Sequence, residues 1–210
     1  MYKLNDRRMN PDEPSYVFKS SKLKVNAAHS MGDKDHFLSN EYCYIGGKWN
    51  HCRDFPTLTL SVYHPVLRKQ ITLFKMECEG ETAECYAKFF TLINKAIGKV
   101  SSEDLFEPMK PAADEAGGLL EGLRRVYGNS ILEKLKTCEI HFLQCSNRQR
   151  ARLHIEKSIE FFSCITRTLI RAQTASAYHD TVQELKDFFA KKPTKDQRGF
   201  LIPWIQWWDD

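Results

Sequence analysis

The sequence lacks any long hydrophobic run. Nowhere do about 18 apolar residues follow one another, so no segment is predicted to span a membrane. The first ten residues carry charge with no apolar run after them, and we expect no secretory signal peptide. Seven cysteines at irregular spacings make no disulfide framework, which indicates a reducing compartment. With neither an internal repeat nor a low-complexity tract, the sequence predicts a soluble, intracellular chain.

Composition and charge set only mild bounds on function. The formal net charge is +4 and the pI is about 8.6, which permits contact with nucleic acid without requiring it. The chain has 210 residues, of which 42% are hydrophobic, and can bury a core of its own. We therefore expect one domain with room for an inserted subdomain.

Three early segments predict β-strands: the first is rich in residues that favour strands, and the other two alternate apolar and polar residues. A turn centred on Gly46 and Gly47, which contains no carboxylate, is expected between the first and the second. Pro65 ends the second strand because proline cannot continue a ladder. The short connections predict an antiparallel meander of strands 41–45, 57–63 and 70–76.

The period then changes to that of a helix, which we expect to begin near Thr82 and to stop at Gly98. A fourth strand would follow, although Pro108 and Pro111 make it a poor central strand. Gly128 is the natural end of the next helix. The remaining predicted elements, in chain order, are the fourth strand 106–113, a helix 115–127, a fifth strand 136–142, and helices in 146–172, 175–190 and 200–208.

This order of elements predicts an α+β fold with a mixed sheet, matching a ribonuclease H-like core with a helical insertion. We divide the chain into three parts. Residues 1–36 are polar and expected to be loosely ordered, residues 37–145 form the core, and residues 146–210 form the helical insertion, which is expected to be incomplete at the C-terminus.

Four stretches, taken together in their order and spacing, resemble the transposases of Mutator-like elements: residues 42–90, 113–128, 138–153 and 200–210. The resemblance covers most of the chain. It implies a ribonuclease H-like fold, DNA as the partner and a nuclear location. In that family three acidic residues hold two divalent metal ions, Mg²⁺ or Mn²⁺, which activate water and then a 3′-hydroxyl for cleavage and transfer of a DNA strand.

Two metal ions about 4 Å apart need carboxylate oxygens to hold them. The resemblance places the first acidic residue at position 46, where this chain has Gly46, and the second at Asp114. Asp54 lies past the expected turn and would have to reach back to replace the first. The segment that should carry the third is expected to be absent, and Asp209 and Asp210 are not interpreted as its replacement. The resemblance thus implies a remnant site in which Asp114 is the catalytic and metal-binding residue.

Asp114 also has a purely structural interpretation. An aspartate directly before a helix accepts hydrogen bonds from the first backbone N–H groups and complements the helix dipole. The two roles are compatible, and the residues alone leave both open.

Cys138 and His141 form a C-x-x-H motif that resembles one in these transposases, and Cys145 could supply a third zinc ligand. No second pair follows at a suitable spacing. The alternative is a buried structural cysteine with a histidine that hydrogen-bonds within the core. We favour that alternative and expect no productively bound metal.

Two further groups of residues could contact DNA. Basic side chains that would grip phosphates, or else form an ordinary solvated helix surface, are Arg124, Arg125, Arg148, Arg152 and Lys157. The tryptophans of segment 200–208 could stack on bases, but their interleaving with apolar residues indicates a core helix first. We also expect this apolar helix to promote association into a homo-oligomer.

These observations predict a Mutator-like transposase-derived domain that is catalytically inactive, because Gly46 replaces the first acidic residue and the third is absent. The alternative is a domesticated, non-catalytic module on the same fold that binds DNA or another protein. DNA affinity with a steep salt dependence would favour the DNA-binding version of that alternative.

Overall fold

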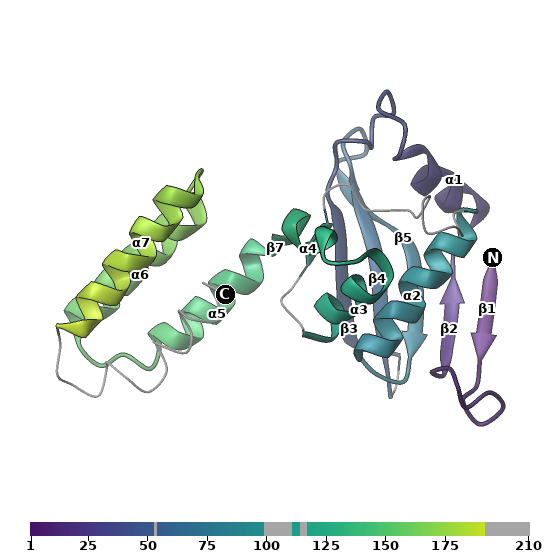
Figure 1. Cartoon of the computed structure of the whole chain (residues 1–210), viewed down its shortest axis with the longest axis horizontal. Helices are drawn as coiled ribbons and strands as arrows, with labels where there is room; N and C mark the ends of the chain where they lie inside the picture. The colour runs from purple at the N-terminus through teal and green to yellow at the C-terminus, as the bar shows by residue number, and fades with distance from the viewer. Residues whose placement is uncertain (53, 99–110, 114–116, 192–210) are drawn as a thin grey trace. The chain divides into compact units, whose positions relative to one another are not determined.

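The chain divides into two compact units, each of which is described by itself. The computed structural model describes residues 1–52, 54–98, 111–113 and 117–191 (Figure 1). The first unit is Met1–Cys138 and combines a sheet with helices, whereas the second begins at Glu139 and is helical. The predicted α+β class with a mixed sheet is confirmed.

Within the described residues the first unit holds a seven-stranded sheet of order β1-β2-β5-β4-β3-β6-β7. The strand pairs β1–β2, β2–β5, β5–β4 and β4–β3 are antiparallel, whereas β3–β6 and β6–β7 are parallel. The strands are β1 Tyr2–Asn5, β2 Tyr16–Lys19, β3 Cys43–Cys52, β4 Phe55–His64, β5 Lys69–Cys78, β6 Pro111–Ala113 and β7 Lys136–Thr137. The predicted meander therefore corresponds to β3, β4 and β5.

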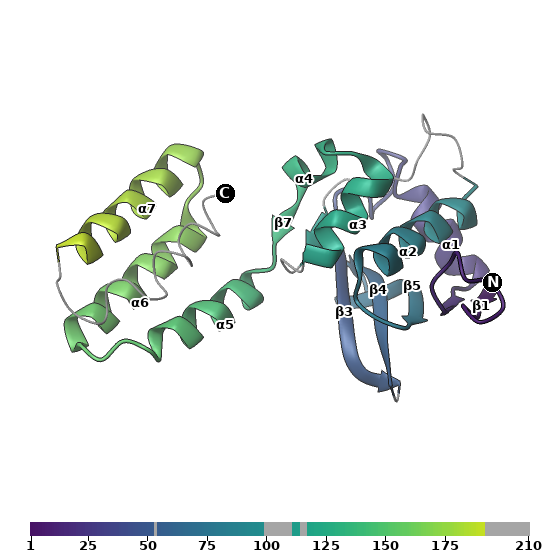
Figure 2. The ribbon, with the colours of Figure 1, turned by 60° about the horizontal axis from the view of Figure 1, so that its bottom comes forward.

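Helices α2 and α3 lie over one face of this sheet (Figures 1 and 2). Their apolar stripes and the inward side chains of the central strands form one core, with Phe74, Phe89 and Leu119 fully buried. The helices of the unit are α1 Lys22–Ser30, α2 Ala83–Ala96, α3 Gly117–Tyr127 and α4 Ser130–Lys134.

Both predicted ends of α2 are confirmed. The Thr82 hydroxyl accepts a hydrogen bond from the backbone N–H of Cys85 at 3.2 Å, which satisfies one of the free donors of the first turn. Beyond the last turn Gly98 has φ 78°, a left-handed conformation that glycine adopts without steric cost. Gly128 ends α3 in the same way, with φ 80°.

The expectation that residues 1–36 are loosely ordered is wrong. The segment supplies β1, β2 and α1, and β2 pairs with β5 inside the sheet. Phe18 is fully buried, and its ring stacks on that of Phe74 with centroids 5.9 Å apart. A four-residue strand offers only two inward positions, here Tyr16 and Phe18, and this is too short an alternation to stand out in a polar sequence.

The turn expected at Gly46 and Gly47 is also misplaced. Both glycines lie inside β3, where Gly46 pairs with Thr59 of β4, and β3 ends only at Cys52, shortly before β4 begins at Phe55. Asp54 has φ 66°, as a tight connection requires. Two adjacent glycines normally mark a turn, but here only Gly47 serves close approach, because other groups occupy the space beside it, whereas the space beside Gly46 is open.

The fifth strand, predicted over 136–142, is only the two residues of β7. The backbone N–H of Cys138 donates to the carbonyl of Ala113 at 2.9 Å, and α5 (Glu139–Arg150) begins at the next residue. Phe142, expected in the sheet, is buried in the core of the second unit instead.

The second unit contains α5, α6 (Glu156–Arg171) and α7 (Ala175–Ala190). The helical pattern of 146–172 is therefore divided between α5 and α6. Phe162, Ile165 and Leu185 are among the buried residues that join the helices. The rings of Phe161 and Phe188 stack with centroids 3.7 Å apart.

The sheet face away from α2 and α3 is called the outer face from here on. Side chains alternate between faces along a strand, so the buried Cys43 and Ile45 point towards the helices and Tyr44 points outwards. Tyr44 pairs with Ser61, which places Tyr63 on the outer face as well. Tyr44 and Tyr63 are 40% and 37% exposed, so no described helix buries this part of the face.

Candidate functional site

The remnant metal site is expected where β3 meets β6. Parallel pairing joins Tyr44 with Ala112 and Ile45 with Ala113, so Gly46 follows directly after the last described pair. Asp114, the predicted metal ligand, lies outside the described residues. The sheet thus makes neighbours of the two strands that lead to the two predicted positions.

Gly46 and Gly47 differ in what surrounds them, because their side chains would leave β3 on opposite faces. A Cβ at Gly46 would meet no atom within 4 Å and would point to the outer face. A Cβ at Gly47 would collide with Oε1 of Glu81 and lie 3.1 Å from the hydroxyl oxygen of Tyr86. A carboxylate at position 46 would therefore project away from Glu81, and only position 47 faces it.

Glu81 is a residue that the sequence analysis missed. It precedes Thr82, the N-cap of α2, and its carboxylate lies where a side chain at Gly47 would begin. The signal that could have identified it is an acidic residue just before a helix that follows a predicted strand. The sequence gives no indication, however, that this carboxylate lies against the middle of β3.

The start of α3 is held against the same region by glycines. A Cβ at Gly118 would collide with the carbonyl oxygen of Glu81, and a Cβ at Gly122 with Cβ of Tyr86. The backbones of α2 and α3 therefore approach more closely than any larger residue at these two positions would permit. This packing fixes the first turn of α3 beside the Glu81 backbone.

The described residues do not fit a two-metal centre. Such a centre needs several oxygen ligands that converge on hard cations. Gly46 contributes none, and within residues 1–52, 54–98, 111–113 and 117–191 no group of three or more His, Cys, Asp or Glu residues could hold a metal ion. Asp54 is no substitute, because six residues of extended β3 from Gly46 to Cys52 span roughly 20 Å.

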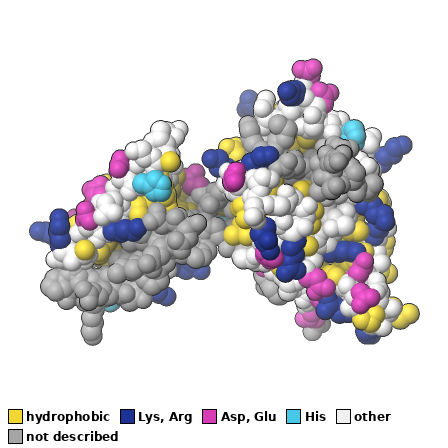
Figure 3. Space-filling view, viewed as in Figure 1, with side chains coloured by type: hydrophobic (Ala, Val, Ile, Leu, Met, Phe, Trp, Pro, Cys, Tyr) yellow, Lys and Arg dark blue, Asp and Glu magenta, His cyan; other side chains and the backbone are white. Residues whose placement is uncertain are grey.

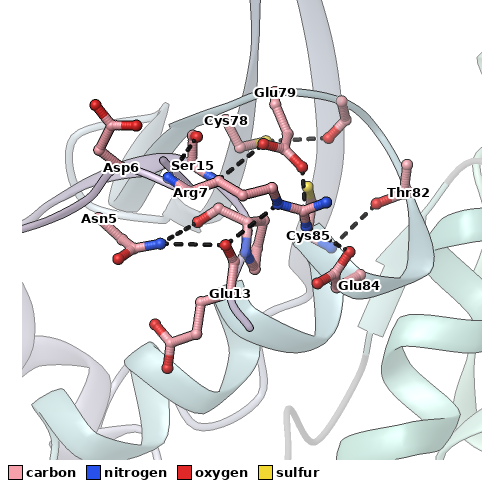
Figure 4. A network of polar contacts seen from close by, with 12 residues as sticks. Asn5, Asp6, Arg7, Glu13, Ser15, Cys78, Glu79, Thr82, Glu84 and Cys85 are labelled. Carbon is pink, nitrogen blue, oxygen red and sulfur yellow. Dashed lines mark hydrogen bonds and ion pairs between the residues drawn. The ribbon is translucent and has the colours of Figure 1, made fainter. Parts of the chain in front are cut away.

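A polar network joins the N-terminal segment to the start of α2 (Figure 4). The Arg7 guanidinium bonds to Glu84 at 2.8 Å and pairs with Glu79 at 3.0 Å. Glu79 in turn accepts a hydrogen bond from the backbone N–H of Ser15 at 3.0 Å. Because Arg7 and Glu84 are substantially exposed, the network is interpreted as a tether for the segment that carries β1 and β2.

Two buried thiols lie beneath this network. Cys78 ends β5, Cys85 lies in the first turn of α2, and the two side chains hydrogen-bond to each other. That bond, together with a weaker one from Thr82, outweighs burial and lowers the pKa of Cys85, while the pKa of Cys78 is raised. Both are fully buried, which keeps them from reagents in solution.

The four predicted DNA-contacting arginines belong to both units. Arg124 and Arg125 lie on α3 and both bond to Glu121, at 2.6 and 2.8 Å. Hydrogen bonds from Arg124 and then Arg125 lower the pKa of Glu121 to about 2. On this side of the first unit basic and acidic side chains are interspersed (Figure 3). Arg148 and Arg152 are exposed residues of the second unit.

The proposed zinc ligands Cys138, His141 and Cys145 fall on the two sides of the boundary between the units. Cys138 is the last residue of the first unit, and His141 and Cys145 lie one helical turn apart on α5. His141 is exposed, and the three residues are not among any metal-holding group of the described chain. The apolar helix predicted at 200–208 and the terminal Asp209 and Asp210 lie outside the described residues.

Comparison with known proteins gives no relative. No family model matches the chain, and neither a curated protein nor a solved structure matches it. Among the described helices none has the length and apolar character needed to cross a membrane.

Proposed function

We propose that the chain is a transposase-derived domain of the Mutator-like kind, on a ribonuclease H-like fold, that no longer cleaves DNA strands. Its partner is DNA and its place of action is the nucleus. Mg²⁺ or Mn²⁺ belonged to the ancestral reaction and has no productive site here.

The observation that carries the proposal is the position of β3 in the sheet. The three-stranded meander, helix, strand, helix and strand follow in the order that the resemblance requires, and β3 lies directly beside the later strand β6. This adjacency supports a site built from the middle of β3 and the residue after β6. An experimental structure should place the Cα atoms of Gly46 and Asp114 within about 12 Å, since two-metal ligands must converge. A larger separation would refute the assignment.

The loss of activity is supported by Gly46. Its position lacks the carboxylate that would bridge two metal ions, and the only described carboxylate beside the adjacent Gly47 is Glu81. One carboxylate cannot clamp both the attacking and the leaving oxygen of an in-line displacement.

A nicking assay tests this loss of activity. Supercoiled plasmid incubated with the full chain and Mg²⁺ or Mn²⁺ should remain as intact as plasmid in chelator, and Gly46→Asp should not change this. Metal-dependent nicking that disappears in Asp114→Ala would show that the site is active.

A non-catalytic DNA-binding module is the second candidate, and the charge of the outer face favours it. Lys19, Lys48 and Lys75 lie on that face. Binding of DNA that weakens steeply with salt, without any nicking, would support this candidate. Absence of DNA binding at low salt would refute it.

A further inference from the structure

The outer face of the sheet carries exposed aromatic rings. Tyr44 of β3 and Tyr63 of β4 are 40% and 37% exposed, on neighbouring strands. Tyr42, just before β3, is 37% exposed, and its ring centroid lies 6.5 Å from that of Tyr44. Large aromatic side chains normally contribute to a core, so three of them grouped on an open sheet form a surface suited to flat partners.

Small hydroxyl residues form the floor next to these rings. Thr59 and Ser61 are two residues apart on β4 and so share the outer face. The Ser61 hydroxyl donates to that of Thr72 on β5 at 3.1 Å. Gly46 adds no side chain between Tyr44 and Lys48, and the space above it is open. The floor is therefore polar beside the rings, with Thr59 and Thr72 partly exposed and Ser61 itself buried.

Lysines surround this floor. Lys48 lies beyond Gly46 on β3, and Lys75 pairs in register with Thr59. Lys19 of β2 pairs with Lys75, and Lys136 of β7 pairs with Ala112, the neighbour of Tyr44. The acidic residue on the same face is Glu77, which is neutralised by Lys75 at 2.8 Å and Lys19 at 3.3 Å. Four lysines and one glutamate give the described face a charge of +3.

We propose that the outer face binds single-stranded nucleic acid, with unpaired bases stacking on Tyr44 and Tyr63 and with phosphates lying along Lys48 and Lys75. An open sheet that presents aromatic rings among basic residues meets both needs of an unpaired strand, a stacking platform and neutralisation of the backbone. The proposal does not depend on transposase descent or on a metal site, because it uses only the surface of the sheet.

The tyrosines favour a single strand over other anionic partners. A duplex buries the faces of its bases, so it could use the lysines but not the rings. An acidic peptide would satisfy the lysines and leave the group of three rings without a role. The partly exposed hydroxyls of Thr59 and Thr72 can hydrogen-bond to sugar or base edges, which a single strand exposes.

The test is fluorescence anisotropy of the full chain with labelled oligothymidine, oligouridine and a duplex of equal length. A single strand should bind more tightly than the duplex, with an affinity that falls as salt rises. Replacing Tyr44 and Tyr63 by leucine should weaken single-strand binding by about tenfold per ring, whereas the matched phenylalanine variants keep the stacking and should bind as the native chain does.

Two charge variants provide an independent arm. Lys48→Gln should weaken single-strand binding several-fold, whereas Lys191→Gln, the same change at the exposed end of α7, should not. Gly46→Asp fits the open space sterically and places an anion on the floor, so it should also weaken binding. A preference for DNA or for RNA would identify the natural strand and would support the proposal in either case.

The proposal is overturned if no single strand binds at low salt up to about 100 µM protein, the weak end of non-specific binding. Equal affinity for the duplex would overturn it as well, as would leucine variants that bind like the phenylalanine variants. A cleavage-active protein that fails to bind single strands would refute this inference and leave the transposase descent untouched.

Discussion

The two adjacent glycines of β3 should respond in opposite ways to the same small substitution. Neither has a positive φ, so alanine is conformationally acceptable at both. At Gly46 a Cβ enters open space, and removal of a flexible glycine from a strand should stabilise the first unit by about 0.5 kcal/mol. At Gly47 the Cβ collides with the Glu81 carboxylate, which is the end of a flexible, half-exposed side chain and can swing aside, so the cost is about 1 kcal/mol.

The expected difference between Gly46→Ala and Gly47→Ala is therefore about 1.5 kcal/mol. Urea unfolding with hydrogen exchange measured on β3 and β4 peptides follows the first unit separately from the helical unit. A double-mutant cycle supplies the control. With Glu81→Ala in the background, Gly47→Ala should lose most of its cost, a coupling of about 1 kcal/mol.

Two outcomes would refute the face assignment. One is a larger cost at Gly46 than at Gly47. The other is a cost at Gly47 that persists in full without the Glu81 carboxylate. Either result would place Glu81 elsewhere and remove the reason why position 46, rather than 47, points away from it.

Three further predictions concern packing and titration. Gly122→Ala should destabilise the first unit by about 1–2 kcal/mol despite the higher helix propensity of alanine, because its Cβ collides with Tyr86. Gly117→Ala, where a Cβ meets no atom within 4 Å, should not destabilise it, and thermal unfolding of the two variants measures the difference. The hydrogen bond from Cys78 is the main cause of the lowered pKa of Cys85, and a group whose pKa is lowered by folding loses its stabilisation as the pH falls. Native stability relative to Cys85→Ser should therefore decrease on acidification, and a difference that does not change with pH would contradict the shift. Burial tends to raise the pKa of Glu77, but the ion pairs with Lys75 and Lys19 lower it overall. Glu77→Gln should therefore reduce the free energy of unfolding by about 1 kcal/mol at pH 7 and by less at pH 3. Urea unfolding at the two pH values measures this, and an equal cost at both would show that the ion pairs contribute nothing.

The local parts of the fold could be predicted from the sequence because their signals lie within a few residues. Thr82 and Gly98 define α2, since capping and left-handed φ are satisfied by the chain next to them. The cores of β4 and β5 were predicted because each strand alternates over enough residues to show its period. The mixed character of the sheet followed from the order of strands and helices.

What the tertiary structure decided involves residues far apart in the chain. Gly46 and Gly47 predict a turn locally, but the Glu81 carboxylate beside Gly47 and the pairing with β4 make them part of a strand. Phe18 is buried because β2 pairs with β5, more than fifty residues later, and a polar N-terminal sequence gives no sign of that partner. Likewise Tyr44 and Tyr63 become one surface only when β3 and β4 align. The register of the sheet determines which side chains share a face, and register is a property of the assembled strands.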